Sequence, residues 1–131
     1  DSKKLLDEIE KVAAKHDKVQ DILLQVNVAR EASKSGMSVE EFPEVRDYAK
    51  TLPHVRVRGL MCMAPFFENP EEARPIFRVA YVLYEDMKGY FPEGDIQYLS
   101  MGMTHDFEVA LQEGANIVRV GTAIFGERVY N

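Results

Sequence analysis

Residues 99–126 read LSMGMTHDFEVALQEGANIVRVGTAIFG, and they are the most informative part of the chain. Their pattern predicts a strand, a glycine turn, a helix, a second strand and a second glycine turn. Each turn carries a hydroxyl, with Ser100 and Gly102 in the first and Gly121 and Thr122 in the second. Glycine lets the main chain approach a ligand, and helix N-termini present unpaired N–H groups. The two turns therefore predict an anion site, most favourably for phosphate.

Three more side chains belong to the candidate site. Arg119 lies in an apolar strand, where alternation places it on the face of Gly121 and opposite Val118, which faces the helices. A buried guanidinium must be paired, so Arg119 faces either a ligand or a carboxylate of the protein. Met61 and Met103 end or follow strands, where they either pack against a flat ring or belong to the core.

Strands alternate with helices along the whole chain, which predicts a parallel sheet of the α/β class. Ligands of such sheets bind at the carboxyl ends of the strands, and (β/α)8 barrels hold phosphate after their seventh and eighth strands. A closed barrel needs eight strands, so four predict half of a (β/α)8 barrel. Such a half either pairs with another copy or relaxes to a flavodoxin-like layer. The expected strands cover residues 22–28, 55–61, 96–99 and 117–120, and the expected helices cover 3–15, 42–52, 70–87 and 104–113.

Local signals fix several details of these elements. Ser38 and Glu41 resemble a capping box, and Asn69 is the expected N-cap of the helix that begins at Pro70. In the strand 55–61, alternation places Arg56, Arg58 and Leu60 on one face. The arginine stems are expected to cover apolar surface, with their heads in solvent or on a carboxylate at the amino end of the strand.

Composition limits the function classes. The 131 residues suffice for one domain, residues 1–131, and the net charge of −6 argues against nucleic acid and anionic membranes as partners. Cys62 is the only cysteine and is expected to be a buried thiol in a reducing compartment. No apolar run is long enough to span a bilayer, so a soluble, cytoplasmic protein is expected. No catalytic residue and no metal site is predicted, because the three histidines have no suitable partners in the sequence.

Three segments carry a family resemblance: VNVAREASKSG (26–36), VRVRGLMCMAP (55–65) and LSMGMTHDFEVALQEGANIVRVGTAIFGER (99–128). Over essentially the whole chain they resemble the C-terminal half of the pyridoxal-phosphate homeostasis proteins, the YggS/PROSC family. The resemblance implies an alanine-racemase-like (β/α)8 barrel that binds pyridoxal 5′-phosphate as a carrier or regulator without established catalysis. It assigns Ser100, Gly102, Gly121 and Thr122 to the phosphate and places Arg119 at the pyridine nitrogen.

The resemblance also implies an absence. The lysine that bonds the cofactor covalently in that family lies at the end of the first barrel strand, and no lysine here matches it. A fragment with the phosphate subsite alone is expected, with weak noncovalent binding and self-association through exposed sheet edges. Two alternatives stay open: half of a pyridoxal-phosphate-dependent racemase or decarboxylase, and an engineered half-barrel without ligand function.

Overall fold

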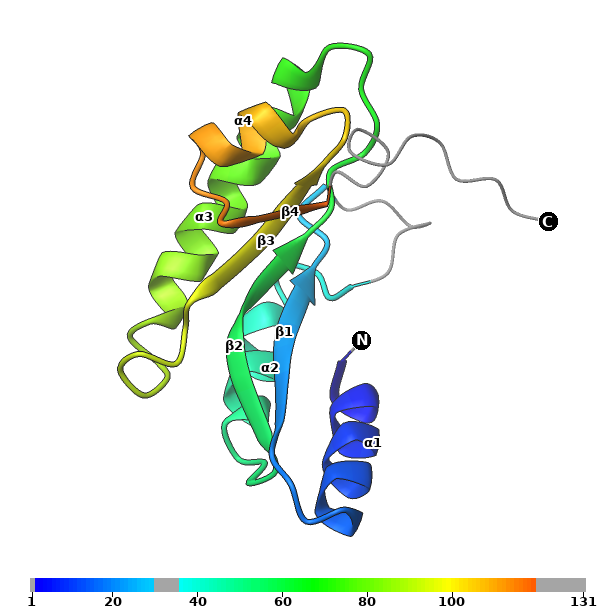
Figure 1. Cartoon of the computed structure of the whole chain (residues 1–131), viewed down its shortest axis with the longest axis vertical. Helices are drawn as coiled ribbons and strands as arrows, with labels where there is room; N and C mark the ends of the chain where they lie inside the picture. Colours follow the sequence, from blue (N-terminus) through cyan, green and yellow to red (C-terminus); the bar gives the residue numbers. More distant parts are fainter. Residues whose placement is uncertain (1, 30–35, 120–131) are drawn as a thin grey trace, which may run out of the picture.

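The computed structural model describes residues 2–29 and 36–119 (Figure 1). These residues form four parallel strands joined by helices. The elements are α1 (Ser2–Lys15), β1 (Gln20–Val26), α2 (Phe42–Ala49), β2 (Val55–Cys62), the 3-10 helix η1 (Pro70–Ala73), α3 (Arg74–Met87), β3 (Tyr98–Met103), α4 (Phe107–Gln112) and β4 (Ile117–Arg119).

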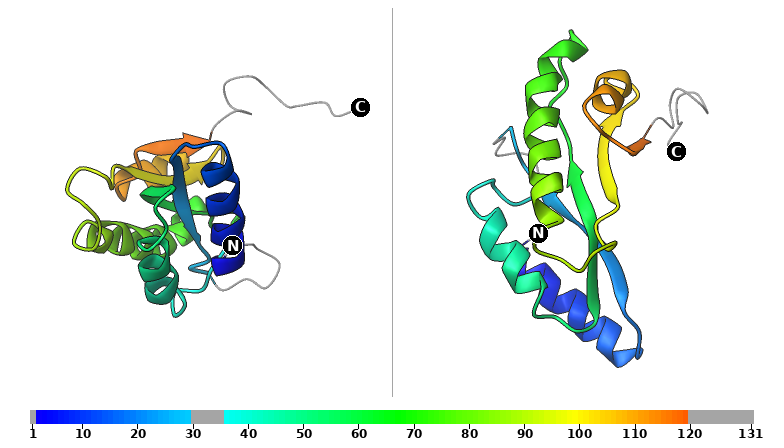
Figure 2. Two further views of the ribbon diagram at one scale, coloured as in Figure 1. Left: turned by 90° about the horizontal axis from the view of Figure 1, so that it is seen from below. Right: turned by 90° about the vertical axis from the view of Figure 1, so that its left-hand side faces the viewer.

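The strands lie in the order β1-β2-β3-β4, and every neighbouring pair is parallel. Figure 2 shows α1, α2 and α3 on one side of the sheet, and α4 packs on β3, β4 and α3. Sequential order with helices on one face is the arrangement of a half-barrel, because a flavodoxin-like layer carries helices on both faces. The expected α/β class and half-barrel are confirmed, and the flavodoxin-like alternative is not what the described elements form.

The two faces of the sheet differ in burial. The helix-covered face carries the hydrophobic core, in which Leu60, Leu99 and Met101 are fully buried. We call the opposite side the inner face and define it by Leu23, Gln25, Met61, Ser100, Ile117 and Arg119. Of these, only Ser100 is fully buried. A ligand or another chain segment therefore meets mixed apolar and polar side chains there.

The expected face of Leu60 is wrong. The pairing of β1 with β2 shifts register, since Ile22 pairs with Val57 and the next residue pairs with Gly59. This bulge turns Leu60 into the core. Glycine is required at the bulge because a Cβ on Gly59 would lie 1.8 Å from the carbonyl oxygen of Tyr98.

The two arginines of β2 bind carboxylates, which is one of the two arrangements expected from the sequence. Arg56 Nη2 lies 2.9 Å from Asp95 Oδ1, and Arg58 Nη1 lies 3.4 Å from Asp21 Oδ2. Arg58 Nε also donates to the carbonyl of Asp95 at 2.8 Å. Their charges are thus bound within the protein, away from the carboxyl ends of the strands.

The third strand differs from its expected range. It was expected over 96–99 with Ser100 and Gly102 in the turn that follows, but β3 runs from Tyr98 to Met103 and contains both residues. Gly102 has a φ of +100°, and the pairing with β4 is irregular between Ser100 and Met103. The glycine therefore makes a bulge inside the strand instead of ending it.

Helix starts follow the local signals. Ser38 Oγ accepts from Glu41 N at 3.1 Å while Ser38 N donates to the Glu41 carboxylate at 3.2 Å, which confirms the capping box. Asn69 Oδ1 accepts from Glu71 N at 3.1 Å, as expected of an N-cap, but the first turn is 3-10 and the α-helix begins at Arg74. None of the described helices combines the length and apolar character that crossing a membrane requires.

Candidate functional site

One row of side chains crosses the inner face of all four strands. Gln25 is the register partner of Met61, Met61 of Ser100, and Ser100 of Ile117. Register partners of parallel strands lie side by side, so Met61 and Ser100 are neighbours although 39 positions separate them in the sequence. The Ser100 hydroxyl has no hydrogen-bond partner among the described residues, which leaves it able to bind a ligand.

Arg119 follows this row on β4. It is the register partner of Met103, and the preceding Val118 packs against the core. The Nε and Nη2 atoms of Arg119 are buried and have no hydrogen-bond partner within the described residues. Buried donors in folded proteins are almost always paired, and an unpaired charged donor is costly. The guanidinium therefore requires an acceptor from outside the described residues.

Gly102 lets α4 pack closely on β3. A Cβ at this position would lie 2.6 Å from the Cβ of Ala110 and 3.2 Å from the Cα of Phe107. Its positive φ would also strain any other residue. Gly102 thus brings the short helix α4 against the carboxyl end of the strand that carries Ser100.

The residues after β3 bind one another. Met103 N donates to Asp106 Oδ1 at 2.7 Å, and Asp106 N donates to the Met103 carbonyl at 3.1 Å. This closed turn delays α4 to Phe107, whereas the helix was expected from residue 104. His105 of the same turn lies against Phe66 and Phe67 of the loop that follows β2.

Cys62 lies behind the site, on the core side of β2. It is a free, fully buried thiol, as expected. Its pKa is raised to about 12, chiefly by burial and to a lesser extent by the nearby Asp106, whereas a hydrogen bond involving Val28 and the charge of Arg119 act in the opposite direction. Protonated at neutral pH, this thiol is no nucleophile.

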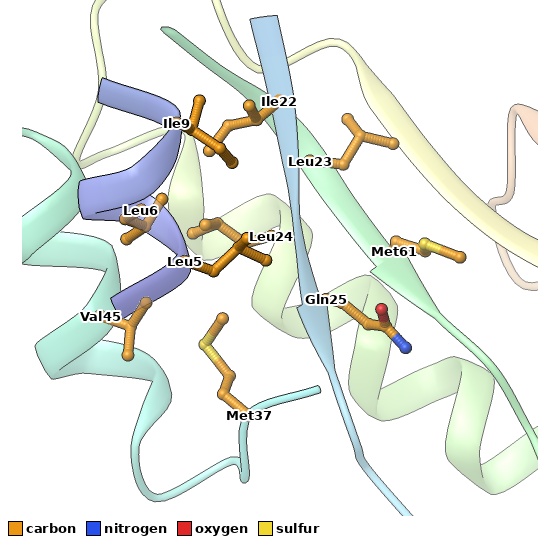
Figure 3. A pocket seen from close by; sticks show the side chains of 10 residues that line it. All are labelled: Leu5, Leu6, Ile9, Ile22, Leu23, Leu24, Gln25, Met37, Val45 and Met61. Atoms are coloured by element: carbon orange, nitrogen blue, oxygen red, sulfur yellow. The ribbon is translucent and has the colours of Figure 1, made fainter. Parts of the chain in front are cut away.

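Met61 also borders a mostly apolar cavity of about 490 Å³ that is lined by residues of α1, of both faces of β1, and of α2 and β2. Figure 3 shows Leu23, Gln25 and Met61 pointing to the side of β1 away from α1, whereas Leu24 points toward it. Gln25 was not among the predicted site residues, because one polar residue in an apolar strand gives no sign of its neighbours. Its register with Met61 places it in the row.

Two of the predicted site residues, Gly121 and Thr122, lie outside the described residues. The structure thus brings Met61, Ser100 and Gly102 together with Met103 and Arg119, on three neighbouring strands. Within the described part of the chain, no group of three or more histidine, cysteine or acidic side chains could hold a metal ion.

Sequence comparison gives two kinds of match. The family model described as alanine racemase, N-terminal domain, matches residues 1–129. A pyridoxal phosphate homeostasis protein of Aquifex aeolicus is 48% identical over 130 residues, which are 99% of this chain and 57% of that protein. The Escherichia coli K12 protein of the same name is 39% identical over 111 residues, 84% of this chain and 46% of that protein. The chain spans about half the length of these relatives.

Solved structures agree with the fold. PipY of Synechococcus elongatus, solved with PLP bound, superposes with a TM-score of 0.76 at 28% identity, over 96% of this chain and 58% of PipY. An unknown protein from Bifidobacterium adolescentis superposes with a TM-score of 0.86 at 33% identity, over 95% of this chain and 50% of that protein. The arginine decarboxylase of Paramecium bursaria Chlorella virus shares the fold alone. It superposes with a TM-score of 0.62 at 16% identity, over 87% of this chain and 36% of the decarboxylase.

The comparisons confirm the resemblance and correct one part of it. A C-terminal half of the homeostasis proteins was expected, but the family model that matches is that of the N-terminal domain of alanine racemase. We therefore describe the chain as a segment of that N-terminal domain.

Proposed function

The chain belongs to the alanine racemase N-terminal domain family, and we propose that it supplies the noncovalent part of a pyridoxal 5′-phosphate site in a cofactor carrier. Relatives named for pyridoxal phosphate homeostasis, and a related structure solved with PLP bound, support this cofactor. The chain's own residues support it independently, through the inner-face row and the buried guanidinium beside it.

The observation that carries the proposal is the unpaired guanidinium of Arg119. Its buried Nε and Nη2 donors fit a ligand that brings an acceptor into the site, and a pyridine nitrogen is such an acceptor. A phosphate oxygen would also satisfy them, but the resemblance assigns the phosphate to the glycine and hydroxyl residues. We therefore assign Arg119 to the pyridine nitrogen.

In this proposal, the phosphate binds Ser100 and Gly102, together with Gly121 and Thr122. The Ser100 hydroxyl is free to donate, and the lack of a side chain at Gly102 lets α4 pack closely against β3 beside it. Met61 neighbours Ser100, and Met103 neighbours Arg119, so the two thioethers flank the space between phosphate and nitrogen. Polarizable methionines pack well against an aromatic ring.

The proposed role is binding without catalysis. Pyridoxal phosphate supplies an electron sink when its ring nitrogen is protonated. The permanent charge of Arg119 disfavours that proton, so a ring held by arginine is a poor electron sink. The described lysines lie on helices, in turns or in the segment before β1, and none of them on a strand, which favours noncovalent binding.

The proposal extends to assembly. β1 is an edge strand of the described sheet, and it borders a cavity lined mostly by apolar side chains. Exposed edges and apolar surface favour association, so we propose that the isolated chain pairs with a second copy.

Titration with pyridoxal phosphate tests the cofactor assignment. The absorbance spectrum of the cofactor should change saturably, and inorganic phosphate should compete for the site. Treatment with borohydride, followed by mass spectrometry, should add no cofactor mass to the chain. Absence of saturable binding, or a covalent adduct at one specific lysine, would overturn the proposal.

A further inference from the structure

Two aromatic residues follow β2 and point in opposite directions. Phe67 packs against the hydrophobic core, whereas Phe66 is 76% exposed, more than any other large apolar side chain in the described part of the chain. Isolated exposed apolar residues are common, but this ring is not isolated. Its centroid lies 4.4 Å from that of the His105 ring, with 31° between the two planes.

His105 also binds the main chain of the same loop. Its Nε2 is hydrogen-bonded to the Phe67 carbonyl. A carbonyl only accepts, so Nε2 carries the proton in this bond, which fixes the neutral ring in its Nε2–H tautomer. Among the described residues, this is the one hydrogen bond of the main chain between Met63 and Glu68.

The contact joins the two loops that border the proposed site. Phe66 and Phe67 belong to the segment that leaves the carboxyl end of β2, where Met61 lies, and His105 belongs to the turn after β3, which carries Ser100. Figure 1 shows the segment between β2 and η1 rising past the end of β2, at the edge where the site is built. A ligand that enters or leaves at this edge passes beside the bridged loops.

We propose that His105 is a positioning residue, which fixes the loop after β2 to the turn after β3 and thereby slows exchange of the bound cofactor. The imidazole supplies both halves of the bridge, a hydrogen bond to Phe67 and a ring face for Phe66. The inference rests on the proposed cofactor site but assigns a role to residues outside it. Neither His105 nor Phe66 contacts the cofactor in this account.

A single indole reports on the bridge without any ligand. The chain has no tryptophan, so Phe66→Trp gives one emitting side chain at the contact. In that background, His105→Leu should lower the fluorescence anisotropy of the indole and raise its quenching by acrylamide. His105→Gln keeps an N–H donor and should preserve more of the anisotropy. His16→Leu, the same substitution at an exposed histidine after α1, should change neither signal.

The exchange rates test the role. With Phe66 restored, His105→Leu should raise the association and dissociation rates of pyridoxal phosphate together, by about 2- to 10-fold, the factor that loss of one hydrogen bond gives. The equilibrium constant should change little, because the proposed cofactor contacts remain. Phe66→Ser removes the other side of the contact at an exposed position and should act in the same direction, which provides a second variant if His105→Leu fails to fold.

The outcomes separate the two proposals. Unchanged indole anisotropy in His105→Leu would overturn the bridge itself, and unchanged exchange rates in a chain that binds the cofactor would overturn its role alone. A parent chain that does not bind pyridoxal phosphate would overturn the proposed function, whatever the indole reports.

Discussion

Met103 of β3 and Arg119 of β4 are register partners at the carboxyl edge of the sheet, and the Nε and Nη2 donors of Arg119 are buried without a partner among the described residues. A charged group in this state costs folding free energy unless something else binds it. We infer that these donors are kept for a ligand, at a cost in folding free energy.

Replacing Arg119 by leucine should therefore separate binding from stability. Arg119→Leu removes the unpaired charge, so the free energy of unfolding should stay constant or rise by about 1–3 kcal/mol. Affinity for pyridoxal phosphate should fall by about 10- to 100-fold, the worth of a hydrogen bond to a charged group. Thermal denaturation and absorbance titration measure the two quantities.

Arg119→Lys is the matched control, because it keeps the charge and loses the planar fork. It should bind with intermediate affinity. Full affinity in Arg119→Leu would show that the guanidinium serves another purpose.

Ser100→Ala tests the phosphate assignment. The hydroxyl has no partner among the described residues, so its removal should change the free energy of unfolding by less than about 1 kcal/mol. Binding of the cofactor, and competition by inorganic phosphate, should weaken by about 2- to 10-fold. Calorimetric titration provides the readout. Equal phosphate competition in both proteins would argue against a contact to Ser100.

Replacing Gly102 of β3 by alanine should destabilise the fold more than the same substitution at Gly94, which has a similar positive φ. Gly102→Ala places a Cβ 2.6 Å from Ala110, whereas Gly94, with a φ of +87°, has no atom within 4 Å of an added Cβ. Gly94→Ala should cost about 1 kcal/mol from backbone strain alone. Gly102→Ala should cost about 2–4 kcal/mol, since overpacking adds to that strain. Urea denaturation measures both, and equal costs would mean that α4 can move aside.

Stability at alkaline pH should report the buried thiol. Burial raises the pKa of Cys62 from 9.0 to about 12 in the folded chain. The neutral thiol therefore favours the folded state, with a contribution that is complete below pH 9 and is lost as the pH rises toward 12. From pH 8 to pH 10, the native chain should lose about 1 kcal/mol more of its unfolding free energy than Cys62→Ala does. Equal losses would show that the thiol ionises freely.

Self-association should depend on the inner face. Leu23→Lys places a charge on edge strand β1 without entering the helix-covered core, so it should shift the chain toward monomer. Val82→Lys, at a 65% exposed position on α3, is the control and should leave the mass unchanged. Sedimentation equilibrium distinguishes the two. A chain that is monomeric without any substitution would contradict the proposed pairing.

The architecture could be predicted from the sequence, because strands that alternate with helices indicate a parallel sheet. The sequence also predicted an inward Arg119, since Val118 and its neighbours alternate regularly. Two bulges escaped it. A glycine at 102 looks the same whether it ends a strand or kinks one, and the need for glycine at 59 lies in the carbonyl of Tyr98, which is distant in the sequence. Periodicity therefore misplaced the end of β3 and the face of Leu60.

The site was predicted in parts and not as an arrangement. Ser100 and Met61 were singled out for different reasons, and only the strand register shows that they are neighbours. Gln25 was missed because its place in the row follows from the same register. The bridge between His105 and Phe67 depends on two loops whose course no local pattern specifies.

A crystal structure of the chain with pyridoxal phosphate would show where the cofactor binds. We expect the cofactor on the inner face at the carboxyl edge of the sheet, with its phosphate on Ser100 and its pyridine nitrogen on Arg119. A structure in which Arg119 pairs with a carboxylate of the protein and the cofactor binds elsewhere would contradict this expectation.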